Sequence, residues 1–265
     1  MNLRRTRLVV LFVSLLSLPL LQSAAHAQQP TWYQVTYVQV RPDLLSEYVE
    51  LQRQEVNPAL QKAGVPWRSA WRMGEFGNTY ERVFATPLRS FAEYDSPGPL
   101  VRGMDARKLE RLQDRLRRSV LSSQTYGVRY RNDLSVESAT TYQRSIAAVT
   151  TLQVAPGRAA EWERFLSQNL PRFRGADIIF GVYQRVFGPG PEVWQIVENL
   201  RSHAELDRPG ILTRAFGDEV DRVAASLAGV LVSVERTVWL RDLDLSYEQV
   251  AATSQQSTGN RTPTR

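Results

Sequence analysis

Hydrophobic residues follow the same order of spacings twice along the chain. In each series a β-branched or aromatic run typical of a strand is followed by a helical spacing, two further strand-like runs, a second helical stretch and a last strand. The first series is predicted at 33–41, 43–62, 66–74, 79–86, 101–121 and 125–131. The second series is predicted at 147–154, 157–174, 177–187, 192–199, 211–231 and 234–241. This order, β-α-β-β-α-β, is that of a ferredoxin-like unit.

The apolar spacing is clearest in the predicted helices. In the second copy, five large apolar residues recur at spacings that place them on one helix face: Trp162, Phe165, Leu166, Leu170 and Phe173. Such a stripe is typical of a helix that packs on a core. Pro58 and Pro171 lie near the ends of the first helix of each series, where we expect a kink or a stop.

A sequence repeat supports the doubled pattern. Residues 88–100 and 200–212 agree at nine of thirteen positions and lie 112 residues apart. Two further pairs of segments match at nearly the same offset: 35–42 with 149–156, and 133–137 with 244–248. An offset of this length indicates two copies of a whole unit rather than a short solenoid repeat.

The repeated phrase is itself explained by local structure. Ser90 and Glu93, like Ser202 and Glu205, have the spacing of a capping box. In that motif the serine oxygen accepts the N3 amide proton and the glutamate accepts the serine N–H. The Pro-Gly pair that follows in each copy is predicted to end the short turn and lead into the next helix.

The strands indicate how two such units pack. A ferredoxin-like sheet carries helices on one face, so its other face needs a second cover. Aromatic residues in strands such as 67–71 and 193–197 disfavour an exposed face. We predict an α+β fold in which two tandem ferredoxin-like units, 32–137 and 146–248, pack sheet to sheet as a single-chain pseudodimeric α+β barrel.

Two segments carry a family resemblance. Residues 47–60, EYVELQRQEVNPAL, resemble the first helix of the dimeric α+β barrel superfamily, which includes antibiotic-biosynthesis monooxygenase-like and NIPSNAP-like domains. Residues 90–95, SFAEYD, are similar to the segment after the third strand of those domains. The resemblance covers 32–245 and implies the fold. It implies no single function, because members range from haem-degrading oxygenases to isomerases and proteins with no known activity.

The two ends of the chain differ from this pattern. Three arginines in the first seven residues precede an apolar run at 8–21 and the sequence Ala-His-Ala at 25–27. We therefore predict that 1–27 is a signal peptide and that the protein is exported, either periplasmic or secreted. The run is shorter than the roughly 20 residues that span a bilayer, although an uncleaved anchor is the alternative. Residues 251–265 are polar and are predicted to be disordered.

Composition narrows the possible classes of function. The chain has no cysteine, so an exported protein of this sequence must be stable without disulfides. Outside the predicted signal peptide it has one histidine, His203, which excludes a His-rich or thiolate metal site. The formal charge of +6 falls to +3 without the three signal arginines, which gives no reason to expect nucleic-acid binding. We predict no metal and no resident cofactor, with haem as the alternative.

Candidate ligand contacts lie on or beside the strands expected to face the buried side. They combine aromatic and polar side chains, which is typical of a ligand cavity. The candidates are Trp67, Trp71, Arg82, Tyr183, Arg185, Trp194, Glu198 and His203. The prediction is an exported protein that binds a small apolar or aromatic ligand, with catalytic residues and oligomeric state unknown. Alternatively, Arg82 and Arg185 are sheet-edge or surface residues that contact no ligand.

Two other functions remain open. His203 could be the axial ligand of a haem in an oxygenase- or isomerase-like enzyme, or an ordinary surface residue. Its counterpart in the first copy is Phe91. The predicted helix 101–121 has seven cations against three acids. That helix could dock an anionic membrane or partner in a non-catalytic interaction protein, or could simply be a solvated face.

Overall fold

The computed structural model describes residues 31–137 and 144–248, called the first half and the second half below. The predicted signal peptide and the predicted disordered tail lie outside the described residues. The strands are β1 Thr31–Val40, β2 Trp67–Met73, β3 Glu81–Leu88, β4 Val120–Tyr130, β5 Ile146–Val154, β6 Gly181–Phe187, β7 Val193–Leu200, β8 Leu231–Arg241 and β9 Tyr247–Glu248. The helices are α1 Leu45–Leu51, α2 Asn57–Lys62, α3 Pro99–Gly103, α4 Ala106–Ser119, α5 Ala159–Gly175, α6 Ile211–Phe216 and α7 Val220–Ser226.

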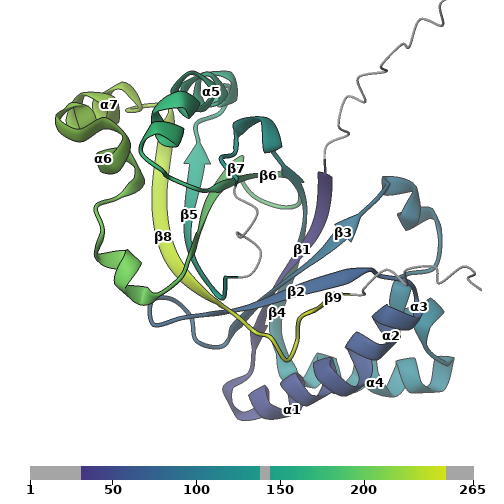
Figure 1. Cartoon of the computed structure of the whole chain (residues 1–265). Coiled ribbons are helices and arrows are strands. Elements are labelled where there is room, and N and C mark those ends of the chain that lie inside the picture. Colours follow the sequence, from purple (N-terminus) through teal and green to yellow (C-terminus); the bar gives the residue numbers. More distant parts are fainter. Residues whose placement is uncertain (1–30, 138–143, 249–265) are drawn as a thin grey trace, which may run out of the picture.

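Eight strands form a closed antiparallel barrel. The order around it is β3-β1-β4-β6-β7-β5-β8-β2, and β2 pairs with β3 to complete the circle. The two halves join by backbone hydrogen bonds at two seams, β4 with β6 and β8 with β2. The helices of each half lie on opposite outer sides of the barrel (Figure 1). No helix in the described part of the chain is both long and apolar enough to cross a membrane.

Aromatic side chains pack against one another in the interior of the barrel. Because side chains alternate along a strand, every second residue points inward. The inward residues include three tyrosines whose rings lie near one another, Tyr33, Tyr130 and Tyr183. Near the other end, the rings of Tyr37 and Trp239 lie 6.0 Å apart. Most of these rings belong to or border a cluster of buried side chains in the barrel interior, and aromatic packing of this kind rigidifies it.

Each half ends in a segment that crosses to the other half. These two straps are the repeated segments 133–137 and 244–248. In the first strap Leu134 enters the core of the second half, and the Ser135 hydroxyl accepts the Val182 N–H at 2.8 Å. In the second strap Leu245 enters the core of the first half, and the Ser246 hydroxyl accepts the Ala70 N–H at 2.9 Å. The straps therefore fasten the two halves together.

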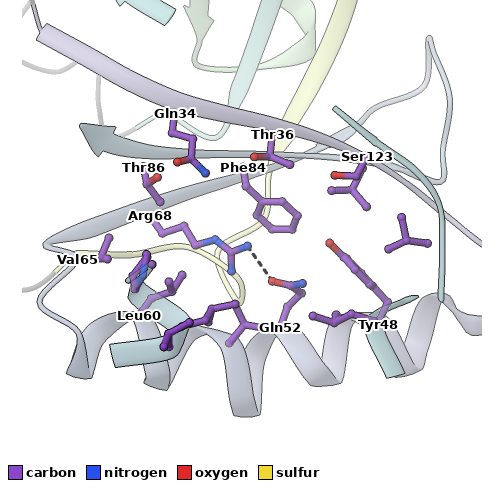
Figure 2. A pocket seen from close by; sticks show the side chains of 18 residues that line it. Gln34, Thr36, Tyr48, Gln52, Leu60, Val65, Arg68, Phe84, Thr86 and Ser123 are labelled. Atoms are coloured by element: carbon purple, nitrogen blue, oxygen red, sulfur yellow. Dashed lines mark hydrogen bonds between the residues drawn. The ribbon is translucent and has the colours of Figure 1, made fainter. Parts of the chain in front are cut away.

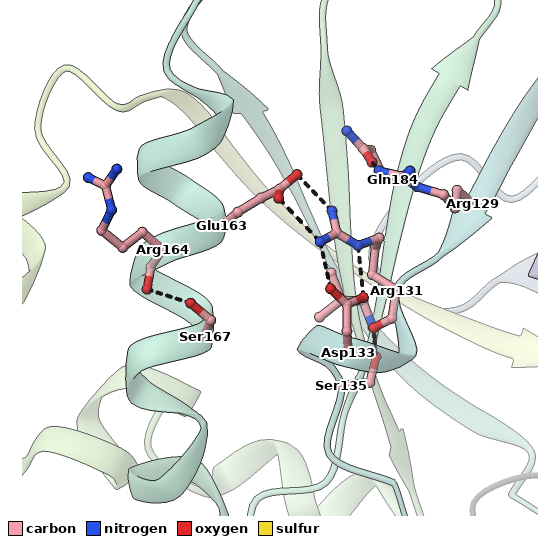
Figure 3. Close-up of polar contacts among 9 residues, drawn as sticks. Arg129, Arg131, Asp133, Ser135, Glu163, Arg164, Ser167 and Gln184 are labelled. Atoms are coloured by element: carbon pink, nitrogen blue, oxygen red, sulfur yellow. Dashed lines mark hydrogen bonds and ion pairs between the residues drawn. The ribbon is translucent and has the colours of Figure 1, made fainter. Parts of the chain in front are cut away.

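An ion-pair cluster clamps the first strap (Figure 3). The Arg131 guanidinium lies between Asp133 of its own strap and Glu163 on α5, with N–O distances of 2.7 Å to each. It also lies over the ring of Trp194, 5.5 Å from the centroid. The hydrogen bonds from Arg131 hold the pKa of the Asp133 carboxyl below its ordinary value. Arg131 thus ties the end of β4 to a helix of the other half.

Several predicted elements differ from the structure. The stretch 101–121 is two helices, because the Asp105 carboxylate accepts the Lys108 N–H and starts α4 as a new helix. The stretch 211–231 is also broken, at Gly217, whose φ of 52° lies in the left-handed region. The last strand of each unit begins earlier than predicted, at Val120 and Leu231.

Neither proline stops its helix, because Pro58 and Pro171 lie within helices that continue past them. A change of winding does occur beside Pro58, where the π-helical turn Gln52–Val56 directly precedes α2.

The predicted serine caps also differ from the structure. The Ser90 hydroxyl accepts the Ala92 N–H, while Glu93 accepts the N–H of Arg89 instead of that of Ser90. The turn after Ser90 is a 3-10 helix, whose tighter winding changes which amides face the cap.

Candidate functional site

A cleft of about 500 Å³ lies on the outer, helix-covered face of the first half. Its floor is formed by outward-facing residues of β1, β3 and β4, and α1, α2, α3 and α4 supply residues to its walls (Figure 2). The volume is within the usual range for small-molecule sites. Most of the lining is apolar, as at Val56 and Leu60 on the helix side and Phe84 on the sheet.

A buried arginine forms part of the cleft wall. Arg68 on β2 is only 6% exposed, and its guanidinium stacks 3.9 Å from the centroid of the Phe84 ring. Its Nη1 donates to Asn57 Oδ1 at 2.6 Å and its Nη2 to Gln52 Oε1 at 2.8 Å. A guanidinium has five N–H donors, so three are not used by these bonds.

No carboxylate pairs with Arg68 among the described residues, and both of its hydrogen-bond acceptors are neutral amides. Burial lowers the pKa of the Arg68 guanidinium to about 10, so it still carries its charge at neutral pH. A buried charge without a counter-charge costs several kcal/mol. An anion in the cleft would offset that cost.

A second buried donor lies near Arg68. Tyr48 on α1 is 2% exposed, and its hydroxyl end points into the cleft in Figure 2. The hydroxyl has no hydrogen-bond partner in the described part of the chain. Burial raises the pKa of the phenol, so the group stays protonated and can donate. Among the described residues that line the cleft there is no Asp, Glu or His, so they offer no evident general base.

The helix that carries these polar residues has a wide turn at the cleft. Between α1 and α2 the chain forms a π-helical turn, η2 Gln52–Val56. Pro58 lacks the N–H that an ordinary helical turn would use, which favours a local change of winding. Single π-helical turns of this kind occur frequently at functional sites. Here the turn places Gln52 and Asn57 on the same guanidinium.

The equivalent space in the second half is filled. The repeat offsets place Phe180 at the position of Arg68, Trp162 at that of Tyr48, and Leu166 at that of Gln52. All three are almost completely buried in one apolar core cluster with Phe173 and Phe216. Large apolar residues of the second half therefore occupy the positions that align with the polar residues of the cleft.

The predicted site residues lie in three different places. The inward-facing group is Trp67, Trp71, Tyr183 and Arg185. Trp71 and Tyr183 pack with the barrel interior, and the Trp67 ring lies 5.5 Å from that of Tyr33. The Arg185 guanidinium lies 3.6 Å from the centroid of the Tyr126 ring and 5.8 Å from that of Tyr37.

The other four predicted residues lie outside the barrel interior. Arg82 is buried on the outer face of β3 and donates to the carbonyls of Thr79 and Glu81. Trp194 and Glu198 are on the helix side of the second half, where Glu198 pairs with Arg214 and Arg236. The side chain of His203 is 50% exposed, and its Nε2 lies 3.4 Å from Glu75. The eight candidates therefore do not form one site.

Sequence reasoning missed Arg68, Tyr48 and Gln52. The sequence repeat could have pointed to these residues. It aligns Arg68, Tyr48 and Gln52 with a phenylalanine, a tryptophan and a leucine of the second half, respectively. Polar residues at three positions that align with buried apolar residues indicate that the two halves differ in this part of their cores.

Comparison with known proteins identifies the fold. No family model matches the sequence, and no curated protein matches it. A putative monooxygenase from Lactobacillus acidophilus NCFM superposes with a TM-score of 0.52 at 7% identity, covering 83% of this chain and 97% of that one. An anthrone oxidase-like protein gives a TM-score of 0.52 at 10% identity, covering 85% and 97%.

A mutant chlorite dismutase from Candidatus Nitrospira defluvii gives a TM-score of 0.50 at 12% identity, covering 80% and 92%. These proteins share the dimeric α+β barrel architecture, and this chain has that fold. At these identities the likeness concerns the fold alone. The NIPSNAP-like resemblance remains a prediction.

Proposed function

We propose that the first half binds a small, mostly apolar anion in the cleft, with Arg68 as its counter-charge. The observation that carries the proposal is the Arg68 guanidinium, which is buried beside an apolar cleft with neutral hydrogen-bond partners and unused donors. The apolar lining would cover the body of the ligand. Arg68 and Tyr48 would donate to one anionic oxygen group, such as a carboxylate or a phenolate.

Cofactor-free oxygenase or isomerase chemistry is the second candidate. Two buried donors, Arg68 and Tyr48, suit a phenolate or enolate as well as a carboxylate. The described lining residues include no carboxylate or imidazole that could remove a proton, so such a substrate would have to enter already ionised. The monooxygenase and oxidase names of the structural relatives belong to those proteins and support this candidate only through the shared fold.

The residues do not fit a haem held through His203. That histidine is half exposed and contacts Glu75 rather than a cavity. No histidine lines the cleft of the first half in the part of the chain that the structure describes. We therefore assign no step to haem.

We also propose that the chain arose by duplication of one unit and that the protein is exported. The two halves are taken as tandem copies of one ferredoxin-like unit, 32–137 and 146–248, which have diverged into a binding copy and a packed copy. The common order of elements and the 112-residue offset support this view. Export is proposed from the signal-like sequence 1–27.

A matched acid and amide test the proposed function. Naphthalene-2-carboxylate and naphthalene-2-carboxamide have nearly the same shape, and only the acid is anionic. Isothermal titration at pH 7 should show at least tenfold tighter binding of the acid, since a hydrogen bond to a charged group contributes about 1.5–3 kcal/mol. The acid should also raise the melting temperature. Equal affinity for the two compounds would contradict the assignment of an anion site, as would failure of any aromatic or alkyl carboxylate to bind.

A further inference from the structure

Four aromatic side chains form a ledge beside the cleft. The ledge consists of Trp32 at the start of β1, Phe91 and Tyr94 after β3, and Phe187 at the end of β6. The Phe91 ring lies 5.0 Å from Trp32 and 5.1 Å from Phe187, centroid to centroid. The Tyr94 ring lies 6.5 Å from Phe91. Three of the four come from the first half and Phe187 from the second, so the ledge crosses a seam of the barrel.

The ledge is open to solvent although it is apolar. Phe91 is 40% exposed, Phe187 is 52% exposed and Tyr94 is 58% exposed. Gly127 on β4 leaves room for the Phe187 ring, because a Cβ there would lie 3.0 Å from Phe187 Cδ2. Contiguous exposed aromatic surface of this kind is typical of a binding surface.

The ledge continues the floor of the cleft. Trp32, Gln34 and Thr36 point to the same side of β1, and Gln34 and Thr36 line the cleft. The Tyr94 hydroxyl donates to Gln34 Oε1 at 2.9 Å, which links the ledge to the cleft directly. From Thr36 to Trp32 the strand spans about 13 Å.

The other seam has polar residues at the aligned positions. The repeat offset relates Phe91 to His203 and Phe187 to Glu75. There the aromatic pair is replaced by a polar contact, His203 Nε2 to Glu75 at 3.4 Å. Aromatic residues therefore occur at the seam beside the cleft, while the seam beside the packed half has a polar pair.

We propose that the ledge binds the extended apolar tail of the ligand whose anionic group lies at Arg68. This inference rests on the proposed function and specifies the substrate class as an elongated amphiphilic monoanion. The anionic head enters the cleft, and the tail leaves along β1 across Trp32 and Phe91 to Phe187. A second copy of this chain or another protein on the ledge is the competing occupant, which the following experiment separates.

Chain length provides the test. Hexanoate can occupy the cleft alone, whereas tetradecanoate is long enough to reach the ledge. The wild-type protein should bind tetradecanoate at least about tenfold more tightly than hexanoate, because the longer chain buries more apolar surface. The double variant Phe91→Ser with Phe187→Ser should lose about tenfold in affinity for tetradecanoate and leave hexanoate unchanged. Phe76→Ser, an exposed phenylalanine outside the ledge, is the matched control.

The outcomes distinguish the two proposals. An equal loss for both chain lengths, or no loss for either, would overturn the ledge assignment and leave the cleft proposal intact. A change in sedimentation of the unliganded double variant, without a change in tetradecanoate affinity, would assign the ledge to a second copy. If neither acid binds the wild-type protein, the cleft proposal fails first. Gly127→Ala, which displaces the Phe187 ring without removing it, should weaken tetradecanoate binding selectively.

Discussion

Replacing Arg68 with glutamine should weaken binding of naphthalene-2-carboxylate by about 10- to 100-fold, which corresponds to the 1.5–3 kcal/mol of hydrogen bonds to a charged group. The variant keeps a donor near Gln52 and Asn57 but removes the buried positive charge. Binding of the neutral amide should change little. The ratio of the two affinities, measured by isothermal titration, should therefore fall toward one.

Arg72→Gln is the matched control for this prediction. Arg72 is on the same strand and the same face as Arg68, but it is exposed and does not line the cleft. It removes the same formal charge and should leave both affinities unchanged. If Arg72→Gln lowers the affinity for naphthalene-2-carboxylate as much as Arg68→Gln does, that affinity depends on the net charge of the protein rather than on a buried site.

Replacing Leu245 with alanine should destabilise the protein by about 2–5 kcal/mol, the usual cost of a large-to-small change in a core. Leu245 is completely buried in the core of the first half, although it belongs to the strap that follows β8. Its carbonyl accepts the Asn57 Nδ2 hydrogen bond at 3.0 Å, and Asn57 in turn holds Arg68. Denaturant unfolding should show the loss, and ligand affinity should fall as well.

Two controls separate the effect on stability from the effect on the site. Leu134→Ala truncates the corresponding leucine of the other strap and should cost a similar free energy of unfolding, but it should leave ligand affinity unchanged. Leu243 is 69% exposed, so Leu243→Ala should change neither property. An unfolding free energy of Leu245→Ala within 0.5 kcal/mol of wild type, the usual range for surface changes, would contradict the role of the strap.

Local pattern was enough to predict the order of elements and the superfamily fold. Each predicted strand overlaps an observed strand, although several ends differ, because β-branched and aromatic runs bounded by turn residues are a local property. Closure of the barrel was harder to predict from the sequence. The seams β4–β6 and β8–β2 depend on strand register between distant segments, which no short window of sequence contains.

The straps show the same limit. The match between 133–137 and 244–248 was visible as a repeat, but its role was not. Leu134 and Leu245 each pack in the core of the opposite half. This crossing depends on the tertiary structure and cannot be predicted from the local sequence. The sequence pattern alone assigned these residues to the ends of their own units.

The candidate site was missed because strand face could not be assigned. Trp71 and Tyr183 are candidate ligand contacts from the sequence, and both pack against the cluster in the barrel interior. Arg68, one position from Trp67, points to the opposite face and lines the cleft. A shift of one residue in a strand moves a side chain to the other face, so aromatic content alone cannot locate the cavity.

The most direct test of the account is a crystal structure of the protein with naphthalene-2-carboxylate. We expect ligand density in the first-half cleft, with a carboxylate oxygen within hydrogen-bond distance of the Arg68 guanidinium and of the Tyr48 hydroxyl. We expect no ligand in the space filled by Phe180 and Trp162 in the second half. Density in the barrel interior or against the second half, with Arg68 unchanged and unengaged, would contradict it.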